Sequence, residues 1–247
     1  MTKTGSSEPK VLPICSKQYW RTALSLVKDT RMLVFAALII ALRVAVKTLK
    51  LTTGTISFTF DCYVNSLGSI VYGPIMGLLV GAVSDTLGCI LVPSPTSPYF
   101  FPFIFVEMSS SFIFALFLWK RPLSPSRTLL CKFTVNMFCN VILTSLFIKW
   151  SYSYFGMDKV YNLFNLQRLV KNMITFPVES MLIVLILQAA IPVLQRCGLK
   201  SILPVKNRLQ KKHYWLIALL LVISVGLILL YIFVLNDLLK ANNIKLL

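Results

Sequence analysis

Long apolar stretches follow one another along this chain and limit what it can fold into. They occupy residues 32–46, 56–72, 75–92, 100–119, 129–150, 166–194 and 214–235. Because a bilayer core about 30 Å thick needs roughly 20 residues of apolar helix to cross it, these stretches predict transmembrane helices. Hydrophobic residues make up 57% of the 247 positions and charged residues only 13%, a composition rare in soluble domains. The sequence therefore predicts an all-α membrane protein, a bundle of six transmembrane helices followed by a seventh near the C-terminus.

The positive charge is unevenly distributed. The net charge of +17 would suit nucleic-acid binding if the cations formed one surface. Instead, residues 3–31 carry six basic residues, residues 120–132 carry four and residues 196–212 carry six, with apolar stretches between them. Basic loops tend to remain cytoplasmic. This pattern predicts a multi-pass plasma-membrane protein whose N-terminus lies in the cytoplasm.

The boundaries between basic segments and apolar stretches divide the chain into four expected parts. Residues 1–30 form a basic cytoplasmic tail, residues 31–195 the six-helix bundle, and residues 196–213 a basic cytoplasmic linker. Residues 214–247 add the extra helix and a short tail. Within the bundle, Gly73 and Pro74 predict a tight break between the second and third helices.

Polar groups inside the predicted spans are the candidates for function. They are Arg43, Asp61, Asp85, Glu107, Arg168, Lys171 and Glu179. Ionisable groups in spans usually face a bundle interior or a watery cavity, and they are usually paired. Arg43, Lys47, Arg168 and Lys171 should lie towards the outer half, where together they would form a cationic pocket for a carboxylated solute.

The same charged residues could instead have purely structural roles. Arg43 and Lys47 lie one turn apart and could reach lipid headgroups. Asp85 could be a buried partner for Arg43 or Arg168, and Glu179 could pair with a neighbouring span.

Small residues recur on the first helix. Ala37, Ala41 and Ala45 are spaced by four and share one face, where another helix could approach closely. The face could serve a partner protein or packing within the bundle.

Several enzyme classes are excluded. The only histidine, His213, lies in a basic segment, so neither a Ser-His-Asp triad nor a histidine-rich metal site can form. No phosphate-binding loop of the GxxxxGK[ST] type is present, so the chain should not hydrolyse ATP itself. The six cysteines are scattered without a CxxC pair. We expect a protein that is not an enzyme and that needs neither a metal nor a cofactor.

An ordered set of short motifs makes the sequence more specific. It comprises ISFTF at 56–60, NSL at 65–67, YGP at 72–74, SDTLG at 84–88, PYFFP at 98–102 and RLVKN at 168–172 followed by Pro177. Over residues 31–194 the chain resembles the folate-type substrate-binding S component (FolT family) of energy-coupling factor transporters. The resemblance departs at Asp61 and Cys62, which interrupt an apolar helix, and at the seventh span, which exceeds the six-helix unit.

The resemblance implies a function and a set of roles. Such a subunit binds a vitamin with high affinity, docks on a transmembrane coupling protein that carries two ATPase subunits, and releases its cargo inside. Ala37, Ala41 and Ala45 would match the docking face. The remaining roles concern folate. The pterin would be sandwiched by Phe58, Phe60, Tyr99 and Phe100. The glutamate carboxylates would be met by Arg43, Arg168 and Lys171, with Lys47 nearby, and the pterin edge would be hydrogen-bonded, or the pocket braced, by Asp85 and Asn172.

Two alternatives stay open. The same architecture could bind riboflavin or thiamine, although riboflavin lacks the carboxylates that the cations favour. A stand-alone secondary transporter would be expected to show inverted repeats, and the sequence has no convincing internal symmetry.

Overall fold

The computed structural model describes residues 13–53, 56–92, 100–156 and 166–199. Trp215, Leu219, Val222 and Gly226 are also described, as helical positions, while the rest of the predicted seventh span lies outside the described residues. So do residues 1–12 of the predicted tail and the proline-rich segment 93–99.

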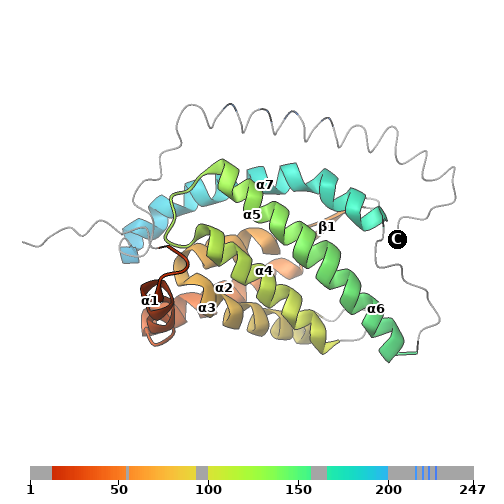
Figure 1. Ribbon diagram of the computed structural model, residues 1–247, viewed down its shortest axis with the longest axis horizontal. Helices are drawn as coiled ribbons and strands as arrows, with labels where there is room; N and C mark the ends of the chain where they lie inside the picture. The colour runs from red at the N-terminus through yellow and green to blue at the C-terminus, as the bar shows by residue number, and fades with distance from the viewer. Residues whose placement is uncertain are drawn as a thin grey trace, which may run out of the picture.

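The described elements are almost all helical (Figure 1). In chain order they are α1 (Lys17–Val27), α2 (Thr30–Lys47), β1 (Lys50–Thr53), β2 (Ile56–Thr59), α3 (Asp61–Leu91), the short 3₁₀ turn η1 (Phe101–Phe103), α4 (Ile104–Leu118), α5 (Pro125–Thr134), the π-helix η2 (Val135–Leu143), α6 (Thr144–Tyr154), α7 (Leu166–Leu194) and η3 (Gln195–Leu199). Helices α2 to α7 lie along the long axis of the molecule, and α1 lies at one end.

The long helix α3 is folded back on itself at Gly73. This residue has φ 76° and ψ −175°, a left-handed conformation that favours glycine, and Pro74 follows it. Ser69 before the break and Gly77 after it both contact Ser111 of α4. The two halves of α3 are therefore antiparallel, which confirms the predicted break and brings the number of bundle helices to six.

A two-stranded hairpin replaces the predicted start of the second helix. Residues 56–72 were expected to be helical, but β2 pairs antiparallel with β1, with Leu51 opposite Phe58, and the helix begins only at Asp61. The run ISFTF is rich in β-branched and aromatic residues, which also suit a strand. This prediction was therefore wrong over its first turn, and the motif lies in a hairpin.

The fifth helix is continuous but changes its winding. Helices α5, η2 and α6 follow one another from Pro125 to Tyr154, with the π-helix in the middle. A π-helix rotates the residues that follow it relative to an α-helix and is often found at functional sites. Three residues that line the cavity described below lie in or next to η2, namely Lys132, Val135 and Asn140.

Apolar side chains from all parts of the bundle meet in one core. Ile70 and Met76 of α3, Phe114 of α4, Cys131 of α5 and Leu187 of α7 are buried together. Glycine brings α3 close to α4: a Cβ on Gly81 would lie 2.8 Å from the Glu107 carbonyl oxygen. Close approach through small residues is typical of membrane bundles.

Four stretches among the described residues are long and apolar enough to cross a membrane. They are Asp61–Leu91, Phe101–Leu118, Pro125–Tyr154 and Thr175–Cys197, with mean hydropathy between 1.5 and 2.0. The first is the folded α3. Together with the fold described above, they make this a multi-pass membrane protein.

Candidate substrate-binding site

A cavity of about 300 Å³ opens inside the bundle. Its walls come from α2, both halves of α3, α4, α5, η2 and α7. The lining residues are Lys47, Asp61, Cys62, Asn65, Gly88, Cys89, Val92, Glu107, Ser110, Lys132, Val135, Asn140 and Glu179. A polar hollow of this size in an apolar bundle is where a small solute would be expected to bind.

Arg43 is fully buried beside the cavity and is held by two carboxylates. Its Nε and Nη2 atoms donate to both oxygens of Asp61, at 2.9 and 2.6 Å, and Nη2 also donates to Glu107 at 2.6 Å. Asp61 begins α3 and Glu107 lies in the first turn of α4, where helix dipoles favour negative charge. Arg43 thus joins α2, α3 and α4, and its contacts are with the protein's own carboxylates.

Lys47 makes the next ion pair, one turn further along α2. Its Nζ lies 3.1 Å from Asp85 Oδ1. Gly88 leaves room for the lysine stem, because a Cβ there would lie 2.8 Å from Lys47 Cδ. Asp85 therefore pairs with Lys47, and its other oxygen, Oδ2, is buried with no hydrogen-bond partner among the described residues. Of the two partners that the sequence suggested for it, Arg43 is bound to Asp61 and Glu107, and the side chain of Arg168 lies outside the described residues.

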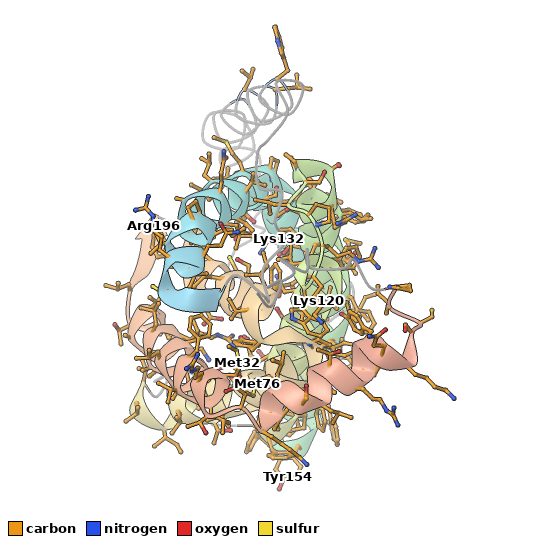
Figure 2. All side chains as sticks on the ribbon, turned by 90° about the vertical axis from the view of Figure 1, so that its left-hand side faces the viewer. Met32, Met76, Lys120, Lys132, Tyr154 and Arg196 are labelled. Carbon is orange, nitrogen blue, oxygen red and sulfur yellow. The ribbon has the colours of Figure 1, made fainter. Side chains whose placement is uncertain are left out.

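A third ion pair crosses the cavity from α5 to α7. Lys132 Nζ lies 2.9 Å from Glu179 Oε2, and Lys132 is almost completely buried. Figure 2 places Lys132 inside the molecule, between α5 and α7. The sequence had grouped Lys132 with a cytoplasmic basic loop, which was wrong. Its position inside the predicted span 129–150 was the available signal. The pairing of Glu179 with a neighbouring span is confirmed.

Amide side chains form a second polar layer. Asn140 donates from Nδ2 to Asn136 Oδ1 at 3.1 Å and to Asn172 Oδ1 at 3.4 Å. Asn172 was a predicted site residue, and through Asn140 it is connected to the cavity wall. Asn65 Oδ1 accepts a hydrogen bond from Ser111 Oγ at 2.9 Å. Sequence reasoning missed Asn65, Asn136 and Asn140. The spacing of four between the last two, inside an apolar span, could have shown that they share a face.

Two of the four aromatic side chains expected to sandwich a pterin are described, and neither lies at the cavity. Phe60 packs against Tyr63, with ring centroids 5.9 Å apart. Phe100 is buried in a separate cluster, 5.6 Å from Trp150 and 5.8 Å from Tyr154. Neither lines the cavity. Phe58 lies on β2, but its side chain, like all of Tyr99, lies outside the described residues.

The expected cationic pocket is not formed by the described side chains. Around the cavity, Asp61, Asp85, Glu107 and Glu179 face Arg43, Lys47 and Lys132. Four carboxylates against three cations leave a nearly neutral site with both donors and acceptors. Arg168 and Lys171 lie on α7, and their side chains are outside the described residues.

The alanine face lies away from the site. Ala37, Ala41 and Ala45 are all exposed on α2, together with Leu38 and Leu42. Arg43 on the same helix is fully buried. Helix α2 therefore presents its alanines outwards and holds its charged residue inwards.

A charge-paired cavity within a multi-pass helical bundle defines a membrane-embedded substrate-binding protein. The family of ECF-type riboflavin transporter S components matches residues 27–196, and the chain belongs to this family. The resemblance to the folate-type S component is confirmed by its relatives. The folate transporter FolT of Leuconostoc mesenteroides is 28% identical over 152 residues, which are 61% of this chain and 81% of the relative. FolT of Clostridium novyi is 25% identical over 157 residues, 63% of this chain and 87% of the relative.

A solved structure agrees. The crystal structure of FolT bound with folic acid matches with a TM-score of 0.52 and 25% sequence identity, covering 62% of this chain and 88% of that one.

Proposed function

We propose that this chain binds a folate-type vitamin in its cavity and delivers it to an ATP-driven importer. The observation that carries the proposal is a cavity of about 300 Å³ lined by polar side chains and bordered by the ion pairs of Arg43, Lys47 and Lys132. The folate transporters among its relatives, and the likeness to a FolT bound with folic acid, support folate as the substrate.

The cavity has groups for both ends of folate. The pterin edge carries neighbouring N–H donors and ring acceptors, which need carboxylate, amide and ammonium partners. Asn140 lines the cavity and, with Asn172 behind it, supplies amides, while Asp85 is paired with Lys47 and braces the pocket. Lys132 and Glu179 present one charge of each sign at the cavity wall.

The glutamate end of folate needs cations. Lys47 lines the cavity and is partly exposed, so it is placed to meet a carboxylate. We assign the same role to Arg168 and Lys171 from the motif RLVKN. Arg43 fixes the helices around the site, because its guanidinium already binds Asp61 and Glu107.

Stacking on the pterin is assigned to aromatic residues of the motifs ISFTF and PYFFP. Phe60 and Phe100 are packed in other clusters, so the role falls to Phe58 and Tyr99 of the same motifs. Val92 lines the cavity directly before the segment that holds Tyr99.

Docking is assigned to the alanine face of α2. A row of exposed small side chains lets a partner helix approach closely. The partner would be a transmembrane coupling protein with two ATPase subunits, as in energy-coupling factor transporters. With the N-terminus in the cytoplasm of a plasma-membrane protein, the vitamin would enter from outside and be released inside.

Riboflavin is the second candidate, because the matched family is described by that vitamin. Its uncharged ring system would use the same donors and acceptors but would leave Lys47 without a carboxylate to bind. Folate and riboflavin binding therefore differ in their dependence on Lys47.

One experiment tests the proposal. The purified chain would be titrated with folate, riboflavin and thiamine while the fluorescence of its four tryptophans is followed. Co-purification with co-expressed coupling and ATPase subunits would be measured in parallel. We expect sub-micromolar folate binding and co-purification. The proposal would be overturned if the chain bound none of the three vitamins.

A further inference from the structure

Helix α1 is an amphipathic helix that the uptake function does not use. Tyr19 and Ala23 are fully buried against Trp119, while Leu26 and Trp20 pack at the edges of the same cluster. In Figure 1, α1 lies at one end of the bundle, and Figure 2, which faces that end, shows it lengthwise across the other helices. This is the orientation of a helix that lies in the plane of a membrane surface.

The outward face of α1 is cationic. Lys17, Arg21 and Lys28 are exposed and spaced by four and seven residues, so they form one strip along the helix. Arg31 is exposed just beyond it. Asp29 is the only acidic residue between positions 13 and 31, and its carboxylate caps α2 by accepting from the Arg31 backbone N–H at 3.0 Å.

Three more cations lie at the same end of the bundle. Tyr19 contacts Trp119, with ring centroids 4.7 Å apart, and Trp119 is followed directly by Lys120 and Arg121. Arg121 is within electrostatic range of Tyr19 and of Arg127. We define the basic corner as Lys17, Arg21, Lys28, Arg31, Lys120, Arg121 and Arg127. None of the seven takes part in an ion pair among the described residues, whereas Arg43, Lys47 and Lys132 inside the bundle all do.

Buried polar atoms lie within this corner. The hydroxyl of Tyr19 and the indole N–H of Trp119 are both buried without a hydrogen-bond partner among the described residues. Burial raises the pKa of Tyr19 to about 12, while Arg121 opposes the rise. Burial also lowers the pKa of Lys120, whose ammonium lies 4.8 Å from the Trp119 ring centroid. Crowded cations without acidic partners favour a bound anion.

Apolar side chains lie within and beside the cationic strip: Leu24 is seven residues from Lys17 and three from Arg21, so it shares their face. Leu24 on α1 is 56% exposed, and Leu33 and Val34 at the start of α2 are 47% and 57% exposed. These residues continue the exposed apolar surface of α2 up to the level of the cations. Apolar side chains interspersed with Lys and Arg can meet acyl chains and anionic headgroups together.

We propose that the basic corner binds acidic phospholipids, with the headgroup phosphates against the strip of Lys17, Arg21 and Lys28 and the acyl chains along Leu24, Leu33 and Val34. A soluble anion would use the cations but would gain nothing from the leucine and valine border. The inference does not depend on which vitamin the cavity binds.

The test uses the full chain in a neutral detergent. Binding of phosphatidylglycerol, phosphatidylcholine and inorganic phosphate would be measured by native mass spectrometry. We expect saturable binding of phosphatidylglycerol, and a loss of about fivefold in affinity for Arg21→Gln, since each cation at an anionic membrane surface contributes about that factor. The matched control is Lys149→Gln, which removes one exposed cation from α6 and should leave the affinity unchanged.

Three results would overturn the proposal. They are equal binding of phosphatidylcholine, binding of inorganic phosphate as tight as that of phosphatidylglycerol, or an equal effect of Arg21→Gln and Lys149→Gln. Loss of coupling-protein co-purification in Arg21→Gln with lipid binding unchanged would assign the strip to a protein partner and would also contradict it. If Arg21→Gln does not fold, the salt dependence decides, because phosphatidylglycerol binding to the unmodified chain must weaken steeply between low and high salt.

Discussion

Arg43 binds Asp61 through both carboxylate oxygens. Replacing either residue would disturb the contact between three helices. The guanidinium has no exposed surface, and its Nη2 also lies 2.6 Å from Glu107. A buried charge in a membrane bundle is stable only when it is paired. The contact therefore holds α2, α3 and α4 around the cavity.

Replacing Arg43 by Met should strongly destabilise the bundle. The change leaves Asp61 and Glu107 without their cation, and breaking a buried pair in this way costs about 3–5 kcal/mol. For a chain of this size, the midpoint of thermal unfolding should fall by roughly 6–20 °C. Adding Asp61→Asn and Glu107→Gln to Arg43→Met should recover part of the loss. An unchanged midpoint for Arg43→Met alone would contradict the role of this residue.

Gly73→Ala should destabilise the fold of α3 more than Gly156→Ala does. Both glycines have positive φ, 76° and 61°, so both substitutions strain the backbone, by about 1–3 kcal/mol each. A Cβ on Gly73 would also lie 2.8 Å from Trp119, whereas nothing lies within 4 Å of one on Gly156. Overpacking adds about 1–3 kcal/mol. Denaturation in detergent would measure both variants, and equal losses would show that the contact with Trp119 is unimportant.

Ala41→Trp should abolish vitamin uptake and leave vitamin binding unchanged. The residue is exposed on α2, so the indole would block a partner helix without entering the bundle. The matched control is Ala189→Trp, at an exposed alanine of α7, which should keep both activities. Uptake by cells and folate binding by the purified variant would be compared. If Ala41→Trp loses binding as well, the alanine face belongs to the bundle and the docking assignment is wrong.

Sequence patterns predicted those parts of the fold that depend on apolar length and strong backbone signals. The six bundle helices follow from runs of apolar residues, and the break in α3 follows from Gly73 and Pro74, which permit a conformation that other residues rarely adopt. The hairpin at β2 was not predicted, because an apolar run of five residues suits a strand as well as a helix end. The amphipathic helix α1 was assigned to a tail, because its apolar residues are too few to span a bilayer.

The candidate site was harder to predict than the fold. Arg43, Asp61, Asp85, Glu107 and Glu179 were recognised because charges within apolar spans are rare. Which carboxylate meets which cation depends on how the helices rotate about their axes, and a single sequence does not give that rotation. The π-helix η2, which lies between Lys132 and α6, has no signature in the residues themselves.

Binding of folate to Lys132→Met, beside Lys149→Met as a control, tests most directly whether the cavity is the vitamin site. Lys132 is buried and lines the cavity, while Lys149 is exposed on α6. Losing the ammonium leaves Glu179 unpaired and removes a hydrogen-bond donor from the cavity wall. We therefore predict that Lys132→Met binds folate at least tenfold more weakly, a loss of about 1.4 kcal/mol. The affinity of Lys149→Met for folate should be unchanged. Thermal unfolding of each variant would verify that it is folded. A folded Lys132→Met that binds folate as tightly as the unmodified chain would contradict the assignment of this cavity.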